Sequence, residues 1–183
     1  MAESLNGILL RKIRFSETSL IVTWFSDRFG KIKTIAKGAL RSQTAFAGKL
    51  DLFFQCDLLI SLSRKSEIHT LREVAIQSAF DGIRKNYLKT SVAAYFIELV
   101  EKTTELDHPA LEIYELLKRA FGYLDQKEPD YRTIPFFESE LCKSLGLQSN
   151  EIGAAAIRLR DTFGTLPKGR AELLKQLGPH EDI

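Results

Sequence analysis

The stretch from Asp27 to Leu50, DRFGKIKTIAKGALRSQTAFAGKL, carries charge of a single sign after its first residue. The basic residues that follow Asp27, with no Asp or Glu among them, are Arg28, Lys31, Lys33, Lys37, Arg41 and Lys49. Ammonium and guanidinium groups gathered in this way bind nucleic-acid phosphates, and nearby aromatic rings stack on bases. Phe29 and Phe46 are the aromatic candidates in this stretch. A solvated sheet face with ordinary lysines is the alternative interpretation.

The distribution of charge along the 183 residues indicates two parts. The net charge is +2, but residues 1–79 hold 12 Lys and Arg against 7 Asp and Glu, whereas residues 80–183 hold 14 against 17. A basic front half and a mildly acidic back half are typical of two bodies with different partners. The length suits two small domains or one large one.

Five strand-like runs precede residue 80 and would position the basic side chains. Runs rich in β-branched and aromatic residues, such as SLIVTWFSD and LFFQCDLLISL, are separated by turn signals such as DRFG and SRKSE. This spacing predicts a small antiparallel barrel or sandwich. Together with the charge balance of +5 over residues 1–79 it favours a barrel of the OB type, a fold that holds single-stranded nucleic acid. Lys31 and Lys33 alternate with apolar residues and so share the outward face of one strand. Lys37, Arg41 and Lys49 follow in the adjoining loop.

From about Ala79 the apolar residues recur with the period of an α-helix. One stripe lies within residues 92–100, a second within residues 111–124, and a third ends at Gly146. A further helix opens with a cap signal at Ser149–Asn150. The sequence therefore predicts an α+β protein, with a five-stranded OB-type barrel over residues 1–79 and an all-α, protein-docking domain over residues 80–183.

Several other functions find little support in the sequence. Cys56 and Cys142 are too few for a disulfide framework or a thiolate zinc site. Glutamates between residues 98 and 115 have helical spacing near His108 and could serve a metal-dependent hydrolase, but the E-x-x-H pair of such sites is missing. The N-terminus lacks a signal-peptide pattern, and no apolar run reaches the roughly 20 residues that span a bilayer. We expect a cytoplasmic protein without a cofactor, a metal or a membrane contact.

Longer segments resemble a known family. The segment FSETSLIVTWFSDRFGKIKTIAKGAL, followed without a gap by AFAGKLDLF and later by HTLREVAIQSAF, is similar to the N-terminal domain of the RecO family of bacterial DNA repair and recombination mediators. In the back half, AAYFIELV and YRTIPFFESELCKSLGL resemble helical segments of that family. The resemblance covers most of residues 1–147, and AKGA in its strand–turn setting is its most specific part.

The resemblance implies an OB barrel followed by a helical domain, and a function without catalysis. It implies a nucleoid-associated protein that binds single- and double-stranded DNA, anneals complementary strands and, with RecR, helps to load RecA. It also implies binding of the acidic, apolar-ended tail of single-stranded DNA-binding protein. The positions that carry over in the barrel are Lys31, Lys37, Gly38 and Gly48. Arg132 precedes the FFE segment, where the family has basic residues near its tail-binding pocket.

Two departures from the family pattern affect these expectations. Many members carry a four-cysteine zinc module after the LG segment, whereas here LGLQSNEIGAAAIRLRD follows directly, so zinc is not expected. The loop after AKGA is usually more basic, and fewer cations release fewer counterions from DNA.

A protein-interaction adaptor that binds acidic peptide tails, with incidental DNA binding, is the alternative function.

Overall fold

The computed structural model describes residues 2–147 and 154–178, so the cap signal expected at Ser149–Asn150 lies outside the described residues. The chain divides into two compact units. The first contains residues 1–79 and 104–115, and the second contains residues 80–103 and 116–183. Segment 104–115, which lies in the helical half as the sequence divides it, therefore belongs with the barrel.

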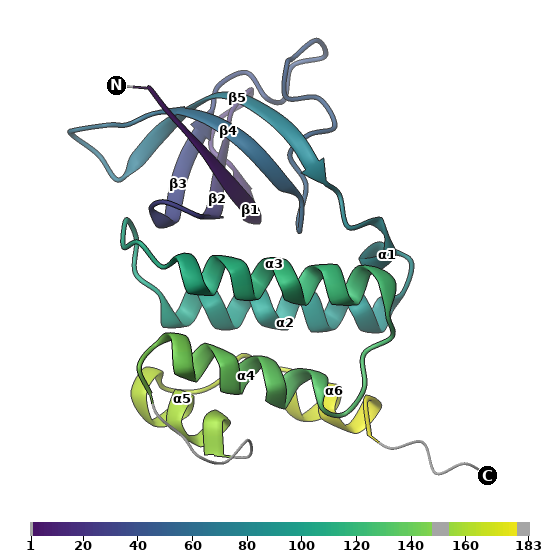
Figure 1. The fold of residues 1–183 in the computed structure, drawn as a ribbon. Coiled ribbons are helices and arrows are strands. Elements are labelled where there is room, and N and C mark those ends of the chain that lie inside the picture. The colour runs from purple at the N-terminus through teal and green to yellow at the C-terminus, as the bar shows by residue number, and fades with distance from the viewer. Residues whose placement is uncertain (1, 148–153, 179–183) are drawn as a thin grey trace. The chain divides into compact units, whose positions relative to one another are not determined.

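Five strands of the first unit close into a barrel in the order β1-β2-β3-β5-β4 (Figure 1). Their bounds are β1 Ala2–Arg14, β2 Leu20–Ser26, β3 Gly30–Ala36, β4 Gln55–Ser61 and β5 Ile68–Ser78. Every neighbouring pair is antiparallel except β3 and β5, which pair in parallel. This closed arrangement of five strands matches the predicted OB-type barrel, and closure leaves no open sheet edge.

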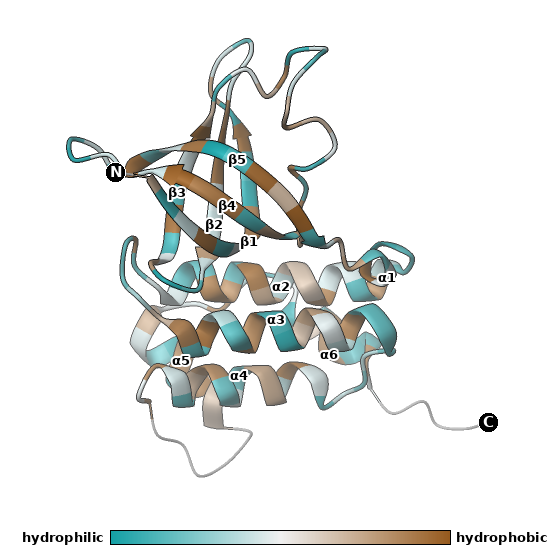
Figure 2. Cartoon of the chain, turned by 45° about the horizontal axis from the view of Figure 1, so that its top comes forward, coloured by the Kyte–Doolittle hydropathy of each residue, from teal (hydrophilic) through white to brown (hydrophobic). Residues whose placement is uncertain are grey.

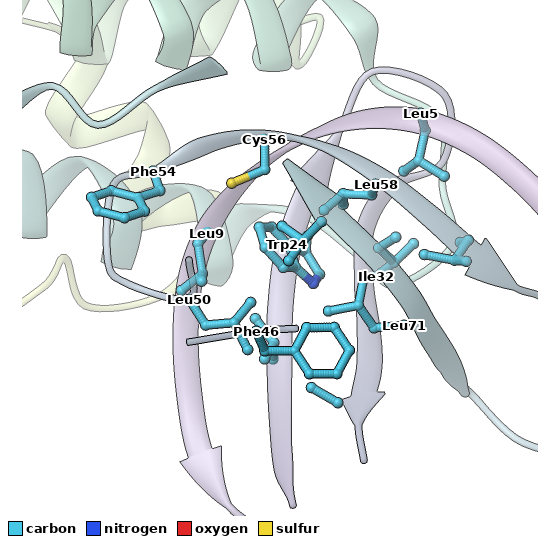
Figure 3. Close-up of a cluster of buried hydrophobic side chains, with 14 residues drawn as sticks. Leu5, Leu9, Trp24, Ile32, Phe46, Leu50, Phe54, Cys56, Leu58 and Leu71 are labelled. Carbon is cyan, nitrogen blue, oxygen red and sulfur yellow. The ribbon is translucent and has the colours of Figure 1, made fainter. Parts of the chain in front are cut away.

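The barrel interior is filled by the apolar side chains that alternate along the strands. Trp24 lies at the centre of this core with no exposed surface, beside Leu9, Ile32 and Leu58 (Figure 3). Its indole Nε1 donates a hydrogen bond of 2.9 Å to the Thr34 hydroxyl, so the one polar atom of the ring is satisfied. The strands accordingly carry alternating apolar and polar residues (Figure 2), as expected where one face is buried.

The segment that follows residue 103 packs along the start of β3. The Asp107 backbone N–H donates to the Lys31 carbonyl at 2.9 Å, and Leu106 forms an isolated parallel bridge with Lys31. Gly30 has a φ of +63°, and a Cβ there would lie 2.0 Å from the His108 carbonyl oxygen. A glycine is therefore required twice over at this position, by its backbone conformation and by the close approach.

The second unit is helical. Its elements are α1 Asp81–Arg84, α2 Tyr87–Thr103, α4 Thr133–Ser144, α5 Ala155–Phe163 and α6 Arg170–Gln176, together with α3 Leu111–Gln126 from residue 116 onward. The Phe96 ring of α2 stacks on the Phe137 ring of α4 with centroids 3.9 Å apart. Within the described part of the chain, no helix is long and apolar enough to cross a bilayer.

A buried charged group joins three of these helices. Glu138 of α4 has no exposed surface, and its carboxylate accepts hydrogen bonds from Arg170 Nε at 2.6 Å and Nη2 at 2.8 Å. The Tyr95 hydroxyl of α2 donates to the same carboxylate at 2.5 Å. Burial, followed by the neighbouring carboxylate, raises the pKa of Tyr95, so this phenol stays protonated and continues to donate.

Candidate functional site

The outward face of β3 carries the central cations of the basic stretch. Burial alternates along the strand, with Ile32, Thr34 and Ala36 inside, while Lys31 and Lys33 point outward. The prediction that these two lysines share the outer face of a closed barrel is confirmed. Lys33 lies opposite Thr23 of β2 and beside Ile68 of β5. Binding on the β2–β3 face, between the loops that flank it, is the usual mode of an OB barrel.

Two of the six cations are engaged by the protein itself. The Lys31 ammonium donates a hydrogen bond to the Thr104 carbonyl of the packed segment. Arg28, in the turn between β2 and β3, forms an ion pair of 2.9 Å with Glu3 and donates to the Ser4 carbonyl. A phosphate would have to compete with these contacts, so both residues are weaker candidates than the sequence indicated.

Lys37 and Arg41 lie together at the far end of β3. Gly38 has a φ of +73° and allows the chain to turn there, and the Arg41 N–H donates to the Gly38 carbonyl at 3.1 Å. Leu40, in the same turn, donates its N–H to the Thr18 carbonyl, which brings this turn against the loop between β1 and β2. Lys37 and Arg41 are both exposed, next to one flanking loop of the β2–β3 face.

The aromatic candidates from the sequence do not serve this face. Phe46 is 9% exposed and lies in the barrel core (Figure 3), so the expectation that it stacks on bases is wrong. Phe29 is partly buried against the same core and is covered by the Arg28 guanidinium. Phe15, in the loop between β1 and β2, is instead 59% exposed. In the sequence Phe15 follows the apolar run that becomes β1, and nothing in that pattern indicates that its ring is free of the core.

Lys49 lies apart from the other cations of the loop. The chain just after it pairs with β1, where the Phe53 N–H donates to the Leu9 carbonyl and the Leu9 N–H donates to the Phe54 carbonyl. Lys12 of β1 also donates to the Leu50 carbonyl at 2.9 Å. Lys49 is half-buried near β1 rather than beside β3. It therefore does not continue the line of cations formed by Lys33 and Lys37.

Two further cations complete the β3 face. The turn between β4 and β5 contains Arg64 and Lys65, both exposed. Because β5 begins at Ile68 opposite Lys33, this turn flanks the opposite end of the face from Lys37. The sequence did contain their signal, two adjacent cations at a hairpin tip, but placing them beside Lys33 needs the parallel β3–β5 pairing. Lys33, Lys37, Arg41, Arg64 and Lys65 are named here the β3 cation row.

The helical unit contains a separate pocket of about 570 Å³. Its apolar wall includes Phe96, Leu116, Phe136 and Phe137 from α2, α3 and α4. Charged side chains stand at the same pocket, and they are Arg119, Asp130 and Arg132. The residue that the sequence singled out as a partner contact, Arg132, therefore does lie beside an apolar pocket. An apolar cavity with a guanidinium beside it suits a peptide that ends in an apolar residue and a carboxylate.

Arg132 forms a close pair with Asp130. Its Nη2 lies 2.9 Å and its Nε 3.2 Å from Asp130 Oδ2, and its side chain is 72% exposed. The guanidinium hydrogen bond holds the pKa of Asp130 below its usual value, and the same contact raises the pKa of Arg132. Both groups therefore stay charged at neutral pH. Tyr131 adds an aromatic face, with the Arg132 guanidinium 5.4 Å from its ring centroid.

The side chains that could bind a metal ion are not clustered in the part of the chain that the structure describes. Across residues 2–147 and 154–178, no three His, Cys, Asp or Glu side chains are grouped so as to hold a metal ion. His69 contacts a single carboxylate: it accepts the Ser63 N–H at Nδ1 and lies 3.2 Å from Asp107 through Nε2. Because Nδ1 accepts, Nε2 carries the proton of the neutral ring and donates to Asp107.

Comparison with known proteins assigns both halves of the chain. Residues 1–80 match the family model described as Recombination protein O N terminal, and residues 84–150 match Recombination protein O C terminal. The DNA repair protein RecO of Syntrophus aciditrophicus is 31% identical over 140 residues, which cover 76% of this chain and 54% of that protein. That of Rhodopirellula baltica is 30% identical over 140 residues, covering 76% and 52%. That of Bacillus cytotoxicus is 28% identical over 148 residues, covering 80% and 58%.

The chain thus spans about half the length of the curated relatives that it matches. Within that span, the two family domains follow one another in the order of the barrel and the helical unit. The five-stranded barrel and the helices after it are consistent with the α+β fold of that family. On these grounds the chain belongs to the RecO family of recombination proteins.

Proposed function

We propose that this protein is a non-enzymatic mediator of DNA repair and homologous recombination that binds single- and double-stranded DNA through its barrel. The observation that carries the proposal is the β3 cation row. The side chains of Lys33, Lys37 and Arg41 have no hydrogen bond or ion pair with any residue that the structure describes, and Lys37 and Arg41 are exposed. Cations without protein partners on the usual binding face of an OB barrel are available to phosphates.

The mechanism needs no bond to be broken. Phosphates repel one another when two strands approach, and a protein that neutralises phosphates of both strands lowers that repulsion. Complementary bases can then meet, which is strand annealing. Exposed Phe15, in the loop between β1 and β2, adds a ring on which an unpaired base can stack. With RecR, the same contacts would help to load RecA.

The pocket of the helical unit supplies the second half of the proposal. A tail with several carboxylates and an apolar end would place the apolar residue against Phe96 and Phe137, and its terminal carboxylate against Arg132. Binding of the tail of single-stranded DNA-binding protein in this manner would bring the mediator to coated strands. The DNA contacts and the tail contact lie in different units, so each can be removed separately.

The DNA half of the proposal is tested by charge reversal. We expect K33E/K37E/R41E to lower the affinity for a fluorescent single-stranded oligonucleotide at least about tenfold in anisotropy titrations, because three phosphate contacts become repulsive. The matched control is R158E/K168E/K175E, which changes the net charge equally at exposed positions of the helical unit. Equal losses in both variants would mean that net charge alone acts, and the β3 cation row would not be the interface.

The alternative is an adaptor that binds acidic peptide tails and meets DNA only incidentally. The 570 Å³ pocket beside Arg132 favours the adaptor, because this pocket could bind a peptide whether or not DNA is bound to the barrel. Calorimetry with a synthetic peptide of four Asp residues followed by a C-terminal Phe, together with the DNA titrations above, distinguishes the adaptor from the mediator. Tight peptide binding with unmeasurable DNA binding at moderate salt would favour the adaptor over the mediator.

A further inference from the structure

Asp130 occupies one of the two edges of the Arg132 guanidinium that a ligand carboxylate could use. Arg132 offers Nε and Nη2 on one edge of its guanidinium, and both point at Asp130 Oδ2. This edge is one of the two through which a guanidinium pairs with a carboxylate in fork geometry. In the free protein, an internal carboxylate therefore stands where the end of an acidic peptide would bind.

The loop geometry fixes Asp130 in this position. Its other oxygen, Oδ1, accepts the Arg132 backbone N–H at 3.0 Å and the Thr133 hydroxyl at 3.3 Å. In return, the Asp130 N–H donates to the Thr133 hydroxyl at 2.9 Å. These bonds form a turn just before α4 and need only a side-chain oxygen, which Asn also provides. The charge of Asp130 is thus separable from its structural role.

At Arg132 an arriving anion meets a neutral pair rather than a free cation, and Arg119 is the other cation that lines the pocket. The Asp130 charge offsets that of Arg132, and the pocket wall beside the pair is apolar. A ligand carboxylate must either displace Asp130 from the guanidinium or sit close to its negative charge. Attraction by Arg132 alone is then weak, and burial of an apolar residue in the pocket has to supply much of the affinity.

We propose that Asp130 is a built-in competitor for Arg132 that sets the specificity of the pocket. It lowers the affinity for every acidic peptide, so that only peptides that also fill the apolar cavity bind tightly, a repulsive element of the kind that specific interfaces use. The inference rests on the proposed function of the pocket as a peptide-tail site, and adds to it the residue that controls selection.

The size of the effect follows from the charge that is removed. Two like charges about 5 Å apart in water repel one another enough to change a binding constant about fourfold, and more where protein excludes water. Asp130 is 40% exposed in its side chain, so the value near that of water applies. We therefore expect D130N to bind an acidic peptide about fourfold more tightly than the wild type.

The test uses two synthetic peptides, four Asp residues followed by a C-terminal Phe and the same peptide ending in Ser, in calorimetry with wild type and D130N. The expected result is tighter binding of both peptides by D130N and a steeper salt dependence, because the site gains a net positive charge. D161N, an exposed acid that does not line the pocket, is the matched control and should bind like the wild type.

The outcomes separate this inference from the function on which it rests. If the wild type and D130N both fail to bind either peptide, the tail-binding function itself is refuted. If the wild type binds but D130N binds equally or more weakly, Asp130 positions Arg132 instead of competing for it, and the inference is overturned. Far-UV circular dichroism of D130N should match the wild type, because Asn keeps the side-chain oxygen that accepts from the Arg132 N–H and the Thr133 hydroxyl.

Discussion

Replacing Arg170 with alanine should destabilise the helical unit strongly. The substitution removes both guanidinium hydrogen bonds, of 2.6 and 2.8 Å, from a Glu138 side chain that is 1% exposed. The carboxylate is then left with the Tyr95 hydroxyl. Breaking a fully buried pair in this way costs about 3–5 kcal/mol. Because the Arg170 side chain is itself 26% exposed, water can reach the vacated space, and we expect about 2–3 kcal/mol.

The assay is urea unfolding followed by two probes. The chain has one tryptophan, Trp24, which lies in the barrel core, so its fluorescence reports the first unit. Circular dichroism at the helical band reports mainly the second unit. K143A, which removes the exposed ion pair of Lys143 and Glu140, is the control and should cost less than about 1 kcal/mol. A loss of under about 0.5 kcal/mol in R170A, by the helical probe, would refute the reasoning.

The remaining predictions concern the barrel and the thiols. Gly30→Ala should destabilise the barrel by at least about 2 kcal/mol, measured by Trp24 fluorescence, because the new Cβ would meet the His108 carbonyl. Gly48→Ala is the control, since Gly48 has a similar φ but open space around it, and it should cost about 1 kcal/mol. Equal costs of the two substitutions would contradict the close approach at Gly30. Burial raises the pKa of Cys56 to about 12, so iodoacetamide at pH 8 should not label this thiol in the folded protein, and mass spectrometry showing rapid labelling would contradict its burial. Since the unfolded thiol ionises first, the free energy of unfolding should fall as the pH rises above about 9, and a flat profile to pH 11 would count against this sign.

The barrel could be predicted from the sequence because its signal is local. Alternation in KIKTIA places Ile32 inside and Lys33 outside whatever the partner strands are, and the structure has this arrangement. The α2 stripe is equally local, and Val92, Phe96 and Leu99 are all buried. Periods of two and 3.6 residues thus establish which side of an element faces a core.

The composition of the site depends on contacts that no local pattern contains. Lys31 looks like Lys33 in the sequence, but a carbonyl 73 residues away binds its ammonium. Arg64 joins the β3 face through the parallel pairing of β5, and Phe46 leaves it by folding into the core. Such long-range placements follow from the topology of the whole chain. The sequence therefore located the basic surface but did not identify which residues belong to it.

The salt dependence of single-strand binding tests the central claim, that cations of the barrel face neutralise phosphates, most directly. Four phosphate contacts, by Lys33, Lys37, Arg41 and one cation of the Arg64–Lys65 turn, predict a slope of about −3 in a plot of the logarithm of the binding constant against that of the salt concentration. For K33E/K37E/R41E the account predicts a slope of about −1 or shallower. A wild-type slope near zero, or the same slope in the variant, would contradict the account.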